Sequence, residues 1–343
     1  MIYQDNYILG KTSAIGLGCW NFGAQWNRVN EEDSIKIIRY AIDNGVNVVD
    51  VSESYGFPDG QCEILLGKAL QDGYRDKVKI ISKIGWFGRR SQDHFQPTNK
   101  IIQKACNILF NKVFKYKDFD VLKRSPELLR LCGHACCGRL NTSYIDILLC
   151  HDNNPSDMEN FIHAFELLKS EGFIKHYGIS TENINVLKRF YDLSNGNCEA
   201  VECDYSLLNR MVESDFLPFC NKHKIAVFTR GTLSRGLLSG KYDRDTVFTE
   251  SSRINWNKGG AFRKRYEQCL DAVDQIKCSL PKSIDIVEAS YKYVFSNPLH
   301  PTVIVGVTSI NQIIKNINIA SSYLQEDLYL NLRDLKTDLR CGW

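Results

Sequence analysis

The strongest constraint on the fold is a regular alternation of short apolar segments with longer amphipathic ones. The short segments, which read as strands, lie at residues 15–18, 46–49, 78–82, 145–149, 174–179, 200–203, 225–229 and 302–305. Helical periodicity indicates helices at residues 31–44, 62–70, 127–139, 158–171, 184–193, 215–222, 284–295 and 310–320. Eight strand and helix pairs in strict alternation predict an α/β fold, a closed parallel (β/α)8 TIM barrel, better than an open sheet.

Three segments depart from this alternation. Residues 2–12 contain a Leu-Gly-Lys turn and predict an N-terminal hairpin that closes the barrel floor. Residues 86–124 and 243–275 are long connections that follow strand ends, so both are expected to overhang the C-terminal face of the barrel. We expect one domain over residues 1–343, with a lid insertion at 86–124 that carries a short helix at 98–110.

Composition places the chain among ordinary globular proteins. Hydrophobic residues make up 43% and charged residues 24%, and the net charge of +3 does not favour nucleic acid or an acidic membrane surface as a partner. The lysine-rich and aromatic segment 86–124 would suit a nucleic-acid surface, but a lid explains the same residues. Neither a membrane span nor a signal peptide is visible, which predicts a cytoplasmic protein.

Thirteen cysteines are scattered along the chain, and most stand inside apolar runs, which is typical of small buried side chains rather than disulfides. The exception is the segment Cys132-Gly-His134-Ala-Cys136-Cys137. On the helix expected there, Cys132 and Cys136 share a face while His134 points elsewhere, and no second ligand pair follows at zinc spacing. Helix packing is therefore favoured over structural zinc, and no metal site is predicted.

Four ionisable residues stand at or just beyond the C-terminal ends of predicted strands, where parallel β/α folds build active sites: Asp50, Tyr55, Lys83 and His151. A tyrosine exchanges protons near neutral pH only beside a cation, which Lys83 supplies. Asp50 would keep that ammonium charged, and His151 would orient a substrate oxygen. This combination suits protonation of a carbonyl group while a cofactor delivers hydride.

Ordered motifs around these residues resemble the aldo-keto reductase superfamily. The matching stretches are Gly16-Leu-Gly-Cys-Trp20-Asn-Phe22-Gly23, Asp50 to Gly56, Ser82-Lys83, Tyr144 to Asp152, Gly178-Ile-Ser180-Thr181, Gly231 to Tyr242, and Val305 to Asn316. Each is weak alone, but the ordered set is specific and covers nearly the whole chain. The resemblance implies a barrel that binds NADP(H) or NAD(H) without a Rossmann domain. It also implies the catalytic tetrad Asp50, Tyr55, Lys83 and His151, with Tyr55 as general acid in reduction.

The same resemblance assigns cofactor contacts to later strand ends. Ser180 should hydrogen-bond the nicotinamide carboxamide, positive side chains after the seventh strand should meet the pyrophosphate, and the start of the last helix should hold the adenosine end. The implied cofactor-binding residues are Cys19, Trp20, Asp50, Ser180, Thr181, Glu202, Arg230, Gly231, Leu233, Arg235, Lys241, Arg253, Gly306, Thr308, Gln312 and Asn316.

Simpler roles are open for several of these positions. Asp50 and Thr308 could cap helices, Arg253 could be a surface arginine, and Lys83 and His151 taken singly would be ordinary lysine and core histidine residues. Glu53 is expected to be a solvated loop residue. Trp20 and Trp86 are expected either to pack at the barrel rim or to line the substrate pocket.

Three positions differ from the family pattern. Many relatives carry glutamine where Glu202 stands, many have an aromatic residue where this chain has Arg230, and several use arginine at the position of Gln312 to grip a 2′-phosphate. The absence of that arginine counts against NADP(H) but does not exclude it, because the similar potassium-channel β subunits bind NADP with glutamine there. NADP(H) is favoured over NAD(H).

The expected activity is an NAD(P)-dependent oxidoreductase that interconverts an alcohol and a small aldehyde, ketone or sugar. The alternative is a cofactor-binding regulatory subunit that resembles the potassium-channel β subunits, which carry a different residue at the position of His151. A metal-dependent hydrolase would need clustered ligands at strand ends, where only His151 qualifies. The individual substrate and the oligomeric state are left open.

Overall fold

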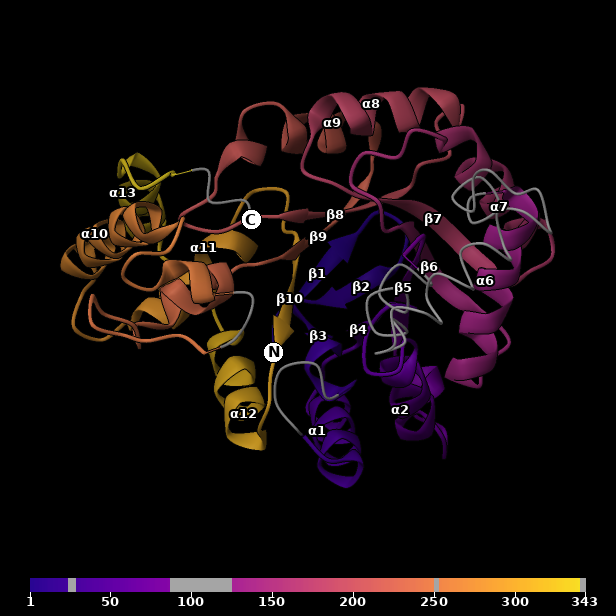
Figure 1. The fold of residues 1–343 in the computed structure, drawn as a ribbon, viewed down its shortest axis with the longest axis horizontal. Helices are drawn as coiled ribbons and strands as arrows, with labels where there is room; N and C mark the ends of the chain where they lie inside the picture. The colour runs from indigo at the N-terminus through magenta and orange to yellow at the C-terminus, as the bar shows by residue number, and fades with distance from the viewer. Residues whose placement is uncertain (24–28, 87–124, 250–252, 340–343) are drawn as a thin grey trace, which may run out of the picture.

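The computed structural model describes residues 1–23, 29–86, 125–249 and 253–339. Its centre is a closed barrel of eight parallel strands, and each strand pairs with the next one along the chain until the last closes on the first (Figure 1). The strands are β3 (Ile15–Gly18), β4 (Val48–Asp50), β5 (Lys79–Ile84), β6 (Ile145–Cys150), β7 (Ile174–Ser180), β8 (Ala200–Asp204), β9 (Ala226–Arg230) and β10 (Thr302–Gly306). The predicted (β/α)8 barrel is confirmed.

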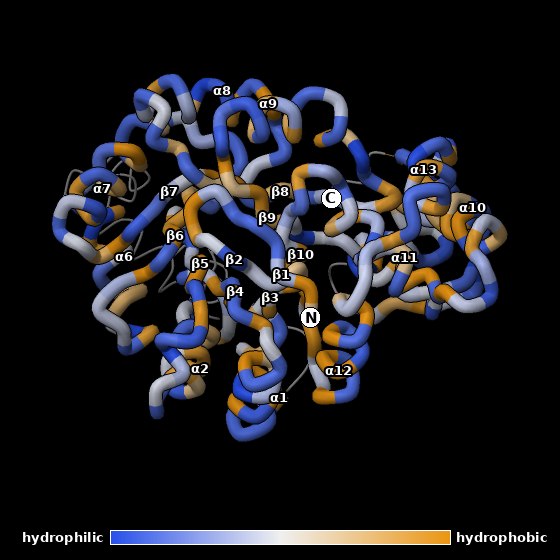
Figure 2. Tube along the Cα trace, turned by 180° about the vertical axis from the view of Figure 1, so that it is seen from behind, coloured by the Kyte–Doolittle hydropathy of each residue, from blue (hydrophilic) through white to orange (hydrophobic). Residues whose placement is uncertain are grey.

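Eight helices follow the barrel strands and surround them (Figure 1). They are α1 (Glu31–Asp43), α2 (Gln61–Ala69), α6 (Pro126–Leu140), α7 (Met158–Ser170), α8 (Ile184–Leu193), α9 (Phe216–His223), α11 (Ile286–Phe295) and α12 (Ile310–Ile319). Apolar and polar residues alternate along them (Figure 2), as expected for helices that bury one face. In α1, for example, Ile37, Ile38 and Ala41 are buried. In the described part of the chain, no helix is long and apolar enough to cross a membrane.

The N-terminal hairpin closes one end of the barrel, as predicted. Strands β1 (Tyr3–Asn6) and β2 (Gly10–Ser13) pair in antiparallel fashion. Between them, Ile8 and Leu9 pack against an apolar cluster contributed by five of the barrel strands. That cluster consists of Val48, Ile81, Ile147, Leu149, Ala200, Ala226 and Phe228. The barrel interior is therefore packed with apolar side chains below the strand ends that carry the polar residues.

The described residues of segment 243–275 contain more helix than the sequence indicated. It contains the 3-10 helix η6 (Ile254–Trp256) and the first part of α10 (Arg263–Ser279), and α13 (Glu326–Asp334) packs on α10. Neither α10 nor α13 was predicted. Trp256 is 1% exposed, and its ring stacks on that of Tyr266 at 5.6 Å between centroids. Aromatic packing thus organises this connection, which lies beside the barrel with α10, α11 and α13 grouped together (Figure 1).

The remaining short helices are 3-10 turns: η1 (Trp20–Gly23), η2 (Arg75–Lys77), η4 (Met211–Glu213) and η5 (Ser234–Ser239). Of the predicted lid at residues 86–124, the structure describes only the first residue, Trp86. Residues 87–124, with the helix expected at 98–110, lie outside the described residues.

Close packing between β7 and β8 makes Gly178 a critical position. A methyl group at Gly178 would lie 1.7 Å from the carbonyl oxygen of Ala200, a backbone atom that cannot rotate away. We expect Gly178→Ala to lower the free energy of unfolding by about 3 kcal/mol or more, measured by urea denaturation.

The matched control is Gly138→Ala in α6. A methyl group there meets nothing within 4 Å. Because alanine favours the helical backbone over glycine, this change should stabilise the protein by roughly 0.5 to 1 kcal/mol. Equal effects of the two substitutions would contradict the packing inferred between β7 and β8.

Candidate active site

The two-residue period of a strand brings the polar residues together above the apolar interior. Val48, Ile81, Ala200 and Phe228 all belong to the interior cluster. Because alternate residues of a strand point to the same side, the residues two positions later also face the lumen. They are Asp50, Lys83, Glu202 and Arg230, to which His151 adds a fifth, two positions after Leu149. The alternation of side chains along each strand therefore brings these buried polar residues to one place.

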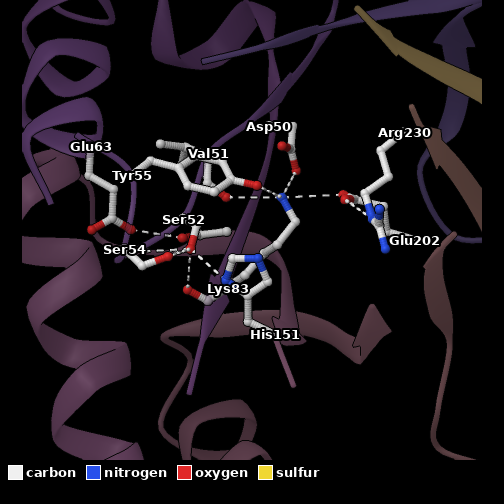
Figure 3. Close-up of polar contacts among 11 residues, drawn as sticks. Asp50, Val51, Ser52, Ser54, Tyr55, Glu63, Lys83, His151, Glu202 and Arg230 are labelled. Carbon is white, nitrogen blue, oxygen red and sulfur yellow. Dashed lines mark hydrogen bonds and ion pairs between the residues drawn. The ribbon is translucent and has the colours of Figure 1, made fainter. Parts of the chain in front are cut away.

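The Lys83 ammonium lies at the centre of this group (Figure 3). The side chain is fully buried, forms a short ion pair with Asp50, and lies 3.2 Å from Oε2 of Glu202. It also donates to the carbonyl oxygen of Val51 at 3.3 Å. Burial alone would lower the pKa of Lys83, but Asp50 and then Glu202 raise it above its usual value. Lys83 is therefore held as a cation.

Tyr55 reaches this ammonium from the loop after β4. Its hydroxyl oxygen accepts a hydrogen bond from Lys83 Nζ at 3.4 Å. The ring stacks on Trp20, with 5.9 Å between centroids and 27° between planes. Burial raises the pKa of Tyr55, Lys83 opposes that rise, and Asp50 and Glu202 add to it. The hydroxyl is therefore protonated at neutral pH and lies beside the cation that would stabilise its anion.

His151 completes the predicted group of four. Its imidazole packs edge-on against the Tyr55 ring, with 5.7 Å between centroids. Nδ1 lies 2.9 Å from the hydroxyl oxygen of Ser52. The backbone carbonyl of His151 accepts a hydrogen bond of 2.7 Å from the Trp86 indole. The sequence did not indicate Ser52, which is fully buried and joins the tyrosine loop to the histidine.

Glu53 is not a solvated loop residue, so that expectation was wrong. Its side chain is fully buried, and Oε1 accepts hydrogen bonds from the backbone of Gly85 at 2.6 Å and of Trp86 at 2.9 Å. Glu53 thus fixes the backbone at the end of β5, where the long insertion begins. A glutamate between two serines gave no sign of this role, because the amides it binds lie 32 and 33 residues away.

The cysteine-rich segment lies on α6 and contributes to packing. Cys136 and Cys137 are buried in the main apolar core. His134 lies against the Phe173 ring at 4.1 Å between centroids, and its Nε2 is 3.2 Å from a Glu171 oxygen. Within the described ranges, no group of three or more histidine, cysteine or acidic residues is arranged to hold a metal ion.

A chain of charges continues from Lys83 along β8 and β9. Arg230 lies 3.8 Å from Glu202, 3.1 Å from Glu182 and 3.5 Å from Asp204. Burial would lower the pKa of Arg230, but Asp204, Glu182 and Glu202 raise it. Gly231 follows with φ of +70°, and a Cβ there would lie 2.4 Å from Asp204 Oδ2. Only glycine therefore lets the Asp204 carboxylate approach this backbone.

Positive charge gathers in the loop after β9. Arg235 is exposed, with φ of +53°, and Arg253 donates a hydrogen bond of 3.3 Å to its carbonyl oxygen. Arg253 also hydrogen-bonds the Tyr242 hydroxyl, so it reaches across to this loop. Although Arg235 is exposed overall, the partial burial of its side chain lowers its pKa, as do Arg230 and Arg253, while Asp204 raises it. The mutual repulsion of these cations means that the loop fits a ligand with several negative charges.

The remaining predicted cofactor residues lie around the same rim. Lys241 is exposed, Leu233 is half-buried, and Gly306 exposes its backbone at the end of β10. Helix α12 begins at the N-cap Ser309, and the Gln312 side chain accepts a hydrogen bond of 2.8 Å from the Thr308 amide.

Four further predicted residues are largely buried. Asn316 is 5% exposed, Ser180 is 3% exposed, and Cys19 is fully buried. Burial raises the pKa of the Cys19 thiol. The Thr181 hydroxyl donates a hydrogen bond of 2.7 Å to the carbonyl oxygen of Asn153, so it holds the β7 loop to the β6 loop.

The comparisons with known proteins agree with this geometry. The sequence model of the aldo/keto reductase family matches residues 14–335. The chain belongs to the aldo/keto reductase family. It is 27% identical to the uncharacterized oxidoreductase YqkF of Bacillus subtilis over 313 residues, which is 90% of this chain and 88% of that protein.

Two further relatives have more specific descriptions. The chain is 29% identical over 242 residues to an NADH-specific methylglyoxal reductase of Escherichia coli, covering 68% of each chain. An aldo-keto reductase of Klebsiella pneumoniae, solved in complex with NADPH, has the same fold with a TM-score of 0.70. That pair is 21% identical, and the match covers 98% of this chain and 96% of the other.

Asp204 should make stability depend on pH. Burial raises the pKa of this carboxyl to about 6, against the opposing effects of Arg230 and Asn209. The Asp204 carboxyl keeps its proton to higher pH in the folded state than in the unfolded state. Its contribution to the free energy of unfolding therefore falls as the pH rises from about 4 to 6. Asn does not titrate, so the free energy of unfolding of Asp204→Asn, relative to that of the wild type, should rise by roughly 2 kcal/mol from pH 4 to pH 7.

Urea unfolding at a series of pH values measures this difference. Asp5→Asn, which removes an exposed carboxylate, controls for the loss of one charge. If the free energies of unfolding of Asp204→Asn and the wild type differ by the same amount at every pH from 4 to 7, Asp204 does not titrate in this range.

Proposed function

We propose that this protein is an NAD(P)-dependent oxidoreductase that interconverts a small aldehyde, ketone or sugar and the corresponding alcohol. The observation that carries the proposal is the contact between the Tyr55 hydroxyl and the buried Lys83 ammonium, 3.4 Å apart. Membership of the aldo/keto reductase family supports an oxidoreductase. A nicotinamide nucleotide, when bound, supplies or accepts the hydride.

In the reduction direction, Tyr55 gives its proton to the carbonyl oxygen as negative charge develops there. Lys83 stabilises the resulting tyrosinate, because its ammonium already contacts the phenol oxygen. Asp50 keeps Lys83 charged and aimed at Tyr55 through their ion pair. Trp20 stacks on the tyrosine ring and limits its rotation. In the oxidation direction the Tyr55 oxygen, as the anion that Lys83 stabilises, takes the alcohol proton.

His151 orients the substrate oxygen, and Ser52 selects the tautomer that makes this possible. The Ser52 hydroxyl has one proton, and its shortest polar contact is His151 Nδ1 at 2.9 Å, against 3.3 Å to the carbonyl oxygen of Lys83. Donation to Nδ1 leaves the proton of the imidazole on Nε2. His151 then has an N–H group to donate to the substrate oxygen beside Tyr55.

The cofactor residues of this proposal surround the barrel mouth. Ser180, Glu202 and Arg230 would meet the nicotinamide, and Arg235, Lys241 and Arg253 the pyrophosphate, which suits the concentration of cations there. Gly306, Thr308, Gln312 and Asn316 would hold the adenosine end at the start of α12.

We propose NADP(H) over NAD(H); the Klebsiella structure contains NADPH, whereas the Escherichia relative is described as NADH-specific. Titration with both reduced nucleotides tests this order.

Replacement of Tyr55 by phenylalanine tests the activity. With NADPH and a panel of small aldehydes, ketones and sugars, kcat should fall by about 100-fold to 10,000-fold, because the proton donor is lost. Affinity for NADPH, measured by fluorescence titration, should stay within about twofold because the aromatic ring remains.

The control is Tyr74→Phe, which removes a hydroxyl that hydrogen-bonds Asp43 at 2.8 Å on the surface. It should leave kcat unchanged. Undiminished turnover in Tyr55→Phe would exclude Tyr55 as the proton donor. Tight NADPH binding without turnover of any carbonyl by the wild type would instead support the alternative of a cofactor-binding regulatory subunit.

Replacement of Ser52 by alanine tests the tautomer. We expect kcat to fall about tenfold with a smaller change in KM, because Nδ1 loses its donor and the proton can move away from Nε2. Nitrogen-15 NMR of the unliganded protein should show a shift of the His151 ring from the Nε2–H form toward the Nδ1–H form.

Ser54→Ala is the matched control, since Ser54 is a buried hydroxyl 3.2 Å from that of Ser52. It should cause the smaller change in both measurements. An unaltered His151 tautomer in Ser52→Ala would rule out this role for Ser52.

A further inference from the structure

Lys83 lies between two buried carboxylates, although one would be enough to keep it charged. Asp50 pairs with the ammonium from β4, and Oε2 of Glu202 lies 3.2 Å away on β8. Glu202 is 1% exposed, and in the described structure its only cationic neighbours are Lys83 and the more distant Arg230. The second carboxylate therefore adds a negative charge to a buried site.

The charges around Glu202 do not cancel. In the described part of the chain, ion pairs join two cations, Lys83 and Arg230, to four carboxyl groups, those of Asp50, Glu202, Asp204 and Glu182. Arg235 adds a third cation beside Asp204, so the carboxyl groups still outnumber the cations by one. Asp50 with Lys83 is a neutral pair, and Arg230 lies closer to Glu182 and Asp204 than to Glu202. Glu202 therefore leaves an excess of negative charge beside Lys83.

This charge lies next to the reacting groups. Glu202 Oε2 and the Tyr55 hydroxyl both contact the same ammonium nitrogen, at 3.2 Å and 3.4 Å. A hydride acceptor or donor must approach the carbon whose oxygen exchanges a proton with Tyr55. The nicotinamide of the proposed function, on which this inference rests, would therefore lie beside Glu202 in either direction of the reaction.

We propose that Glu202 makes the site select the oxidised nicotinamide, whose ring is a cation, over the reduced form, whose ring is neutral. A buried carboxylate attracts the cation and has no comparable interaction with the neutral ring. A neutral amide at this position would lack that discrimination. Glu202 thereby favours oxidation of an alcohol by the oxidised cofactor and slows release of the oxidised cofactor after reduction of a carbonyl.

The preference should depend on pH in a defined direction. The groups that face Glu202 are Lys83 from β5, Asp50 from β4, Arg230 from β9, Tyr55 from the loop after β4 and the neutral Ser180 from β7. Burial and then Glu202 raise the pKa of Asp50 well above its usual range. Uptake of a proton by Asp50 neutralises the excess charge around Lys83, so selection of the oxidised cofactor weakens at low pH.

The experiment compares dissociation constants of NADP+ and NADPH for the wild type and Glu202→Gln, by calorimetry at pH 6 and pH 8.5. At pH 8.5, Glu202→Gln should change the ratio of the two dissociation constants by about tenfold in favour of NADPH binding. This is the order of magnitude expected for the loss of one buried charge that Arg230 partly offsets. The shift should be smaller at pH 6. Glu202→Asp, which keeps the charge, should retain the wild-type preference.

Glu182→Gln is the matched control, because it removes a carboxylate from Arg230 without removing the contact with Lys83. It should shift the ratio by less than about twofold. An unchanged ratio in Glu202→Gln, or an equal shift in Glu182→Gln, would overturn the inference while leaving the proposed function intact. Failure of the wild type to bind either NADP(H) or NAD(H) would overturn both.

Discussion

The arrangement of the site depends on one buried ammonium group, that of Lys83. A lysine with no exposed surface is costly unless carboxylates compensate its charge, and here β4 and β8 supply them in Asp50 and Glu202. Those contacts hold β4, β5 and β8 around one nitrogen atom, which also contacts the Tyr55 hydroxyl. The electrostatic requirement of Lys83 therefore also creates the environment of the proposed proton donor.

The barrel provides this environment through the alternation of side chains along its strands and through its apolar interior. Apolar side chains fill the lumen below, and the tip of the N-terminal hairpin packs against them, so the polar residues occupy only the upper end. Charges that lie there interact through a medium of low polarity and are held by strands rather than by loops. The site can thus combine a cationic lysine, a neutral tyrosine and an additional carboxylate within hydrogen-bonding distance.

Much of this could be predicted from local patterns. The barrel strands and the hairpin follow from hydrophobic periodicity, and the approach of Asp50, Tyr55, Lys83 and His151 follows from their positions at strand ends. The patterns failed where long-range contacts decide the outcome. Glu53 reads as a loop residue but is buried against the backbone after β5. Helix α10 was missed because polar residues dominate it, although Tyr266 and Leu270 bury one face.

The sequence by itself determined the order of the barrel strands and of the helices that follow them, and which residue types stand at the strand ends, because strand and helix periods depend on near neighbours. Only the tertiary structure decided that Glu202 approaches Lys83, that Ser52 contacts His151 and that Arg253 reaches Tyr242. These pairs are separated by between 11 and 119 residues and come from different strands or loops. Their distances result from barrel closure and packing, which no local pattern contains.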